Sequence, residues 1–294
     1  NLNLDPEKAD TYTFGVVAQP SFLPRFAISA DYYHIKVKDV IGAPTPGDLI
    51  SACFGGLSAA SATDPNCTVI RRNPFTGGLD GDPAITGGLF APLTNQGRLF
   101  TDGIDVIANY NTDLGFADWA IAFSGNYTFN SKFKATPAGL NRECVGYYSS
   151  NCSFTGSLQP KFQWSLRNTF TIDEIDLSLL WRHIDRMEQE PDDILNGNGP
   201  TFVGTLPATG ANDFLQGRDV NFQRQKAYDI FDLTARVNVN DNFTFTFAVQ
   251  NLLDKLPPLV GTGVSGSTYN GGNVYPSTYD SLGRRYAVGA RIRF

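Results

Sequence analysis

Few side chains of this 294-residue chain have the spacing of a catalytic site. Its two histidines are His34 and His183, and neither accompanies a Gly-x-Ser-x-Gly elbow or a cysteine and histidine arrangement that would activate a nucleophile. The sequence therefore predicts no catalytic residue, no cofactor and no enzymatic activity.

Recognition of a small molecule is the chemistry that the remaining side chains favour. Two adjacent arginines could pair with an anionic group, and four aromatic rings could stack on a sugar ring or an aromatic chelator. The same side chains could instead pack the connections that carry them. The candidates for ligand binding are Arg71, Arg72, Tyr147, Tyr148, Phe202 and Phe222.

The four cysteines lie in stretches rich in Gly, Ser, Asn and Pro. They show no C-x-x-C spacing and have no neighbouring histidine, so a zinc site is disfavoured. Disulfides formed in an oxidising compartment are the better interpretation. Three connectivities are possible, and we predict Cys53 with Cys67 and Cys144 with Cys152, because this pairing closes the shortest loops.

An acidic segment, EQEPDDILNGNG from Glu188 to Gly199, offers oxygen ligands in a Gly-containing stretch. Calcium binds such ligands, but the spacing is not that of a known calcium loop. We therefore expect a solvated loop here and no metal site.

Composition restricts the partners of the chain. The formal net charge is -6 and no basic patch stands out, which argues against a nucleic-acid partner. No apolar run approaches the roughly 20 residues of a membrane helix, whereas a barrel strand needs only about 9 to 11 residues. The chain opens with NLNLDPEKAD and not with a signal peptide, so we expect that a leader has been removed or that residue 1 is not the natural start.

Alternating apolar and polar residues recur along the whole chain, which is typical of β-strands. In the segment around Phe245, for example, Phe, Phe, Phe and Val alternate with Thr, Thr, Ala and Gln. About nine strands are predicted: Thr11–Gln19, Arg25–Val40, Arg98–Thr112, Ala117–Phe133, Leu158–Ile172, Ile175–Met187, Lys226–Val239, Phe243–Leu252 and Arg284–Phe294.

The connections between these strands alternate strictly in length. Short ones are predicted at Pro20–Pro24, Asp113–Phe116, Asp173–Glu174 and Asn240–Asn242, and long ones at Ile41–Gly97, Lys134–Ser157, Glu188–Gln225 and Leu253–Gly283. Outer-membrane barrels have short periplasmic turns and long extracellular loops. This pattern predicts a transmembrane antiparallel β-barrel whose C-terminus lies on the short-turn, periplasmic side.

Aromatic residues mark both ends of the predicted strands, as in the girdles of a membrane barrel. Trp119, Phe243 and Phe294 lie toward the short turns, and Trp164 and Trp181 toward the long connections. A soluble antiparallel sandwich, for instance a glycan-binding module, would share the alternation but has no reason to sort its loops by length.

Four segments resemble TonB-dependent outer-membrane receptors. NLNLDPEKADTYTFG resembles an N-x-L-x-PE motif of their barrels, and LTNQGRLFTDGIDV resembles a strand with an N-x-G and a G-(I/V)-(D/E) element. VQNLLDKLPPLV resembles their NLFDK-x-P segment, and YDSLGRRYAVGARIRF resembles their terminal strand. The four motifs occur in the same order as in that family.

The resemblance implies a 22-stranded barrel around an N-terminal plug, energised by the TonB complex of the inner membrane. No plug is recognisable, so residues 1–294 are expected to be a C-terminal portion of the barrel, about nine strands, with residue 1 at a fragment boundary, a cleavage site or a chain junction. The implied partners are the plug and the remaining strands, the TonB complex, the lipid bilayer and a small-molecule ligand such as a siderophore, metal complex, vitamin or oligosaccharide.

The terminal strand has a second implied role. In outer-membrane barrels a C-terminal alternating strand ending in an aromatic residue is the signal for the barrel-assembly machinery, and the matching residues are Tyr286, Val288, Ala290, Ile292 and Phe294. A passive porin-like channel is the alternative function within the same fold class.

Overall fold

A computed structural model describes most of the chain. The described residues are 4–43, 49–50, 53–54, 58–79, 84–90, 93–134, 141–149, 152, 157–190, 206–207, 219–220, 224–259 and 274–293. They belong to two compact units, one of residues 1–12, 34–101 and 130–143 and a larger one of 13–33, 102–129 and 144–294.

Nine long strands follow one another as neighbours in a single sheet, in the order of the sequence. Neighbouring strands from β6 to β17 along this path are antiparallel, so this part of the chain forms a meander. The strands are β1 (Lys8–Ala18), β2 (Phe26–Gly42), β5 (Thr94–Asp113), β6 (Asp118–Lys134), β9 (Phe162–Ile172), β10 (Ile175–Ile184), β15 (Tyr228–Asn240), β16 (Phe243–Gln250) and β17 (Arg285–Ile292). The all-β prediction and the nine predicted strands are confirmed.

Strand register aligns the apolar residues of neighbouring strands on one face. Trp119 of β6 faces Phe170 of β9, and Phe170 faces Leu177 of β10. Because side chains alternate across a sheet, the residues between them form a polar face, where Thr171 donates a hydrogen bond to Asp176 (2.6 Å) and Arg236 forms an ion pair with Asp176.

The apolar face is exposed. Phe14, Leu177 and Val288 keep 72%, 45% and 65% of their surface accessible. A row of large exposed apolar side chains across a whole sheet suits contact with hydrocarbon and would be costly in water.

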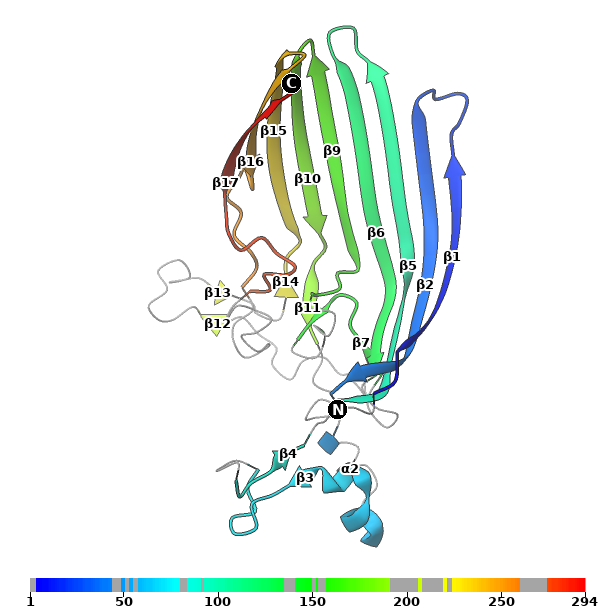
Figure 1. The fold of residues 1–294 in the computed structure, drawn as a ribbon, viewed down its shortest axis with the longest axis vertical. Helices are drawn as coiled ribbons and strands as arrows, with labels where there is room; N and C mark the ends of the chain where they lie inside the picture. Colours follow the sequence, from blue (N-terminus) through cyan, green and yellow to red (C-terminus); the bar gives the residue numbers. More distant parts are fainter. Residues whose placement is uncertain are drawn as a thin grey trace. The chain divides into compact units, whose positions relative to one another are not determined.

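The short turns lie at one end of the larger unit, together with the C-terminal end of β17 (Figure 1). Backbone conformation explains why these turns are tight, since Asp173 has φ 47° and Gly115 has φ 83°, both in the left-handed region that closes hairpins. The predicted sorting of short and long connections is confirmed.

The long connections carry small elements that the sequence did not distinguish from loops. They include a 3₁₀ helix (Ala59–Thr63), α2 (Pro65–Thr68), β3 (Ile70–Arg71), β4 (Gly88–Leu89), β7 (Arg142–Glu143), β8 (Tyr147–Tyr148), β11 (Met187–Gln189), β12 (Leu206–Pro207), β13 (Asp219–Val220) and β14 (Arg224–Gln225). β14, β11 and β8 form a separate three-stranded sheet.

Two predicted strands stop clearly short beside a long connection. The strand predicted at Leu158–Ile172 forms only from Phe162, as β9, and the other is the strand predicted at Ile175–Met187. The alternation predicts strand structure up to Met187, but β10 ends at Ile184 and Met187 begins β11. The reason is tertiary, because the Met187 side chain is 1% exposed within the packed core of the long connections.

Both predicted disulfides are present, Cys53–Cys67 and Cys144–Cys152, with Cα–Cα distances of 4.7 Å and 5.2 Å. No helix in the described part of the chain is both long and apolar enough to cross a membrane. Within the described residues, β17 pairs with β16 alone, so its other edge has no partner strand there.

Candidate functional site

A cavity of about 580 Å³ opens on the polar face of the larger unit. Its wall combines carboxylates, amides, hydroxyls and one guanidinium, which can donate and accept hydrogen bonds. The polar residues of the lining are Asp105, Ser124, Asn126, Gln163, Ser165, Arg182, His183, Tyr228, Thr278 and Asp280.

Strand register brings these side chains together. Ser165 of β9 faces Arg182 of β10, and Arg182 faces Ile230 of β15, so the three share the polar face. Each lies near the end of its strand that leads to a long connection. The candidate site is therefore where the sheet meets those connections.

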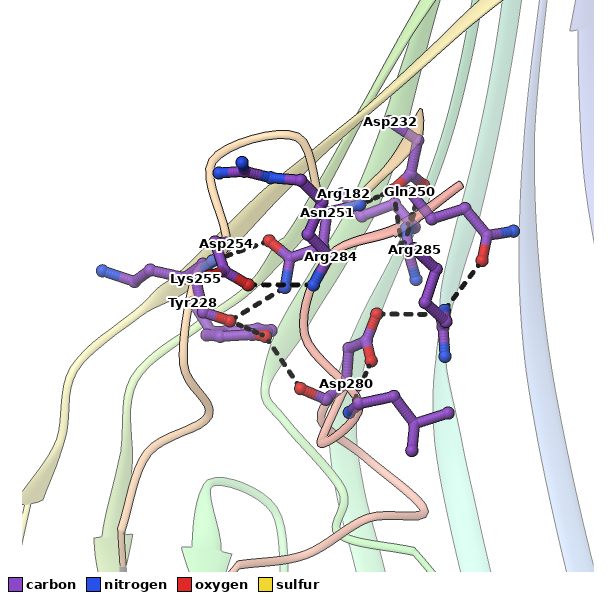
Figure 2. Close-up of polar contacts among 11 residues, drawn as sticks. Arg182, Tyr228, Asp232, Gln250, Asn251, Asp254, Lys255, Asp280, Arg284 and Arg285 are labelled. Carbon is purple, nitrogen blue, oxygen red and sulfur yellow. Dashed lines mark hydrogen bonds and ion pairs between the residues drawn. The ribbon is translucent and has the colours of Figure 1, made fainter. Parts of the chain in front are cut away.

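Arg182, which lines the cavity, is held by Asp232, and Figure 2 shows this pair. The Arg182 Nε and Nη2 groups donate to the two carboxylate oxygens of Asp232 at 3.0 Å and 3.2 Å. The backbone N–H of Asn251 donates to the same carboxylate at 2.8 Å. Such a two-pronged contact fixes the plane of the guanidinium, which a lysine in this place could not reproduce.

Asn251 folds the chain after β16 into a tight loop. Its side chain donates to the carbonyl of Lys255 (2.9 Å) and accepts from the N–H of Lys255 (2.7 Å). Asn251 has φ 51° and Asp254 has φ 54°, left-handed conformations that asparagine and aspartate tolerate better than other residues. The Tyr228 hydroxyl donates to the Lys255 carbonyl at 3.3 Å and so joins this loop to the cavity wall.

The segment before β17 is attached to the same network. Arg285 donates to Asp280 (3.0 Å) and to Gln250 (3.0 Å), while the backbone N–H of Arg284 donates to Asp254 at 2.9 Å (Figure 2). The side chain of Asp280 is only 6% exposed. These contacts hold the lining residues Thr278 and Asp280 against the sheet.

The wall formed by β2, β5 and β6 is also internally bonded. Asn126 donates to Asp105 at 2.8 Å and to the hydroxyl of Tyr33 at 3.1 Å. A Cβ on Gly103 would come within 2.4 Å of that hydroxyl, so only glycine leaves room for the Tyr33 ring here.

The long connections beside the cavity have their own core. Its buried members are Tyr148, Leu158, Met187, Tyr228, Ile230, Tyr275 and Tyr279. The Tyr279 hydroxyl donates to Gln225 at 2.8 Å. Burial raises the pKa of the Tyr148 and Tyr279 phenols well above the ordinary value, because the ionised form would lose its hydration. Tyr228 and Ile230 belong both to this core and to the cavity wall.

The structure places the sequence candidates in several environments. The Arg71 guanidinium lies 4.4 Å from the centre of the Phe90 ring, and Arg72 donates to the carbonyl of Gly77 at 2.9 Å. Tyr147 is half-buried, whereas Tyr148 is fully buried in the connection core. Phe202 and Phe222 lie outside the described residues.

The cavity lining itself was not among the sequence candidates. Arg182 and Gln163 could have been identified from the alternation of inward and outward residues along each strand. In a barrel, the polar residues of the inward row that lie close to a long connection point into the lumen. Alternation alone, however, does not say which neighbouring strands approach to form a pocket.

The acidic segment is described only in part. Glu188 pairs with Arg224 at 3.4 Å, and the buried Glu190 accepts a hydrogen bond from Ser149. Residues 191–199 of this segment lie outside the described part of the chain. In the described residues no group of three or more His, Cys, Asp or Glu side chains gathers to hold a metal ion.

Comparison with known proteins decides the family. A family model described as TonB dependent receptor-like, beta-barrel, matches residues 1–252. The chain belongs to the TonB-dependent receptor β-barrel family. No sequence among curated proteins matches it.

Solved structures of a ferric enterobactin receptor, an iron transporter and a copper transporter share this fold. A variant of the ferric enterobactin receptor PfeA from Pseudomonas aeruginosa, in complex with enterobactin, has a TM-score of 0.56 at 14% identity and covers 100% of the chain. The FrpB iron transporter from Neisseria meningitidis gives 0.53 at 12% identity over 99%, and the copper transporter OprC gives 0.52 at 15% over 99%. The chain spans 32% of the length of each of these proteins.

Proposed function

We propose that this chain forms part of the barrel wall of a TonB-dependent outer-membrane transporter that takes up a scarce nutrient. The observation that carries the proposal is the cavity on the polar face, bounded by Arg182, Tyr228 and Asp280 and lying beside the long connections. A ligand arriving from the side of the long connections would meet these groups first. The exposed apolar face would contact lipid.

The location and partners follow from this assignment. The wall spans the outer membrane of a Gram-negative bacterium, the long connections are extracellular and the C-terminus is periplasmic. The plug, the remaining strands and the TonB complex supply closure and energy coupling. The barrel-assembly machinery would recognise the row of Tyr286, Val288, Ala290, Ile292 and Phe294. The first four residues of this row face Val249, Phe247, Phe245 and Phe243 across the sheet, and Phe294 lies outside the described residues.

The cavity suits a compact polar ligand. Carboxylates at Asp105 and Asp280 accept hydrogen bonds, and Arg182 donates them, so both the donors and the anionic oxygens of a metal chelate or sugar could be matched. Similar receptors are described as acting on ferric enterobactin, iron and copper. Siderophores, metal complexes, vitamins and oligosaccharides are the ligand classes to test. Arg71, Arg72, Tyr147, Phe202 and Phe222 are proposed as outer contacts, and Tyr148 as a packing residue beneath them.

Uptake by a complemented deletion strain tests this function. The complete receptor should restore growth on one ligand class at limiting concentration. Gln163→Ala and Asn126→Ala should each weaken binding of that ligand roughly three- to tenfold, because each removes a hydrogen-bonding group from the cavity wall. Thr246→Ala is the matched control, since it lies on the same face nearer the short turns and does not line the cavity. If growth on every ligand class is the same with and without the receptor, the proposal is refuted.

A further inference from the structure

Most charges around the cavity on the polar face are balanced within the protein. Three titratable residues of its lining are bound to an acidic or basic side chain, at nitrogen to oxygen distances of 2.8 to 3.0 Å. The pairs are Arg182–Asp232, His183–Asp229 and Asp280–Arg285. Any charge on these lining residues is therefore offset by its partner, and neither Arg182 nor Asp280 presents a free ionic group to a ligand.

Asp105 is the exception in this lining. Its carboxylate is exposed and accepts a hydrogen bond from the side-chain amide of Asn126 at 2.8 Å. Among the residues that the structure describes, no cation lies within ion-pair distance of this carboxylate. The cavity therefore carries one unbalanced negative charge, in a chain whose formal net charge is -6. An anion that entered the cavity would lose hydration and meet repulsion where it needs a cation.

Beside Asp105, strands β6 and β9 present uncharged polar groups in a regular array. Ser124 faces Ser165, and Asn126 faces Gln163 across the two strands. Neighbours on one face lie about 6.6 Å apart along a strand and about 4.8 Å apart between strands. In the described part of the chain the side chains of Ser124, Ser165 and Gln163 form no hydrogen bond, so they are available to a ligand. Hydroxyl and amide groups both donate and accept, which matches the hydrogen bonding of an alcohol.

Three isoleucines give the lining a second chemistry. They are Ile107, Ile184 and Ile230. Ile107 lies two residues after Asp105 in β5, and thus on the same face, and keeps 47% of its surface exposed. An exposed apolar side chain beside a carboxylate and amides suits a ligand whose C–H surface adjoins its polar groups.

We infer that this cavity binds an uncharged carbohydrate, such as a neutral oligosaccharide, and not an anionic metal chelate. Hydroxyl groups of the sugar would donate to the Asp105 carboxylate and exchange hydrogen bonds with Gln163, while the C–H face of a ring would lie on Ile107. Arg182 and Asp280 shape the wall through their partners. The inference rests on the proposed function, whose transported ligand it narrows to one class.

A cation is the other ligand that the charge of Asp105 would attract. The lining offers it one exposed carboxylate, already bonded to the Asn126 amide, beside groups that are uncharged. Several neutral hydrogen-bonding groups around one carboxylate favour a ligand with many hydroxyls over a ligand with one strong charge.

Titration of the complete receptor in neutral detergent tests this charge preference. Isothermal calorimetry compares neutral trisaccharides of glucose, galactose, xylose and mannose with three charged probes: trigalacturonate, ferric enterobactin and the diamine putrescine. One neutral trisaccharide should bind about fivefold or more tightly than every charged probe, because like charges repel at contact even in water. Equal or tighter binding of either anion would overturn the inference in favour of an anion site, and that of putrescine in favour of a cation site. Absence of binding by all four neutral trisaccharides would also overturn it.

Asp105→Asn is the sharper test, because it should move two affinities in opposite directions. The substitution removes the charge and keeps an oxygen for the Asn126 amide. Affinity for the neutral trisaccharide should fall about fivefold, since a carboxylate accepts from hydroxyls more strongly than an amide does. Affinity for trigalacturonate, weak in the wild type, should rise about fivefold as the repulsion disappears. With heat-modifiable gel mobility showing a folded barrel, a parallel change of both affinities would overturn the inference.

Asp118→Asn is the matched control. Asp118 faces Thr171 on the same polar face near the short turns and does not line the cavity. At roughly 26 Å along β6 from Asn126, its charge is screened at physiological salt. This variant should change each affinity less than twofold, and a shift equal to that of Asp105→Asn would show that the preference does not arise in the cavity.

Uptake separates this inference from the proposed function. A receptor that restores growth on a ferric chelate at limiting concentration but binds no neutral trisaccharide would support transport and overturn the ligand class. A receptor that binds a neutral trisaccharide but leaves growth on it unchanged would uphold the ligand class and contradict the proposed function alone.

Discussion

The guanidinium of Arg182 and the carboxylate of Asp232 form a two-pronged pair, with donor to acceptor distances of 3.0 Å and 3.2 Å, at the edge of the cavity on the polar face. The backbone N–H of Asn251 also donates a hydrogen bond to the Asp232 carboxylate. The pair thus ties β10 and β15 to the loop that follows β16, and the shape of the candidate site depends on it.

Replacing Asp232 by Ala should therefore weaken both fold and site. It leaves the guanidinium of Arg182 and the N–H of Asn251 without their acceptor, at an expected cost of about 1.5 to 3 kcal/mol in the free energy of unfolding. Thermal unfolding in detergent measures the loss. Arg182→Lys is a second variant to compare, because it keeps the positive charge but cannot form the two-pronged contact with Asp232. Unchanged ligand affinity in this variant would show that the geometry of the pair does not matter.

His183 and Asp229 form a polar pair on the apolar face. His183 Nδ1 lies 2.8 Å from Asp229 Oδ1, to which Trp181 also donates at 2.8 Å. Asp229→Leu alone should destabilise the protein, because it leaves the imidazole of His183 and the indole N–H of Trp181 without their hydrogen-bond partner. Combined with His183→Phe, it should be less harmful than alone, since a pair of apolar residues suits this face. A double-mutant cycle of unfolding measures the coupling, and purely additive effects would contradict it.

The Cys144–Cys152 disulfide should matter more for ligand binding than the Cys53–Cys67 disulfide. The first closes a connection whose core shares Tyr228 with the cavity wall, while the second lies in the smaller unit. Replacing both cysteines of either pair by Ser should cost about 2 to 3 kcal/mol of local stability by loop entropy. Limited proteolysis and ligand titration of the two double variants distinguish them, and an equal effect on affinity would be the contrary result.

Alkaline pH should loosen the connection core. The pKa of Tyr148 and of Tyr279 is raised in the folded state, so the neutral phenol is favoured there. Their contribution to stability is fully present below the unfolded pKa of about 10 and is lost as pH rises from there through the folded pKa. Tyrosinate absorbance followed with hydrogen exchange across this range measures the effect, and Tyr279→Phe should reduce it. Titration of both phenols at their ordinary pKa would contradict it.

A charged residue in place of Phe294 should impair membrane assembly. The apolar row of β17 would then end in a group that does not fit the assembly signal, and the protein should accumulate in the periplasm. Fractionation of cells expressing Phe294→Asp measures this, with Arg293→Gln, on the other face of the strand, as control. A normal membrane yield of the Phe294 variant would be evidence against the signal role.

The alternation of apolar and polar residues was enough to predict most of the fold. Rows such as Phe243, Phe245 and Phe247 are readable without a structure, because side chains of a strand must alternate between faces. The same holds for the sorted turn lengths and the two local disulfides. Boundaries were less accurate where a strand entered packed connections, as at Met187.

The site could not be derived in the same way. Gln163, Arg182 and Tyr228 are separated by long stretches of sequence, and only strand register and the closure of the connections place them around one cavity. Sequence alone determined which faces are apolar and where the chain turns, since these are local properties. Tertiary structure decided which polar side chains meet, because that depends on registers and irregularities fixed only when distant strands pair.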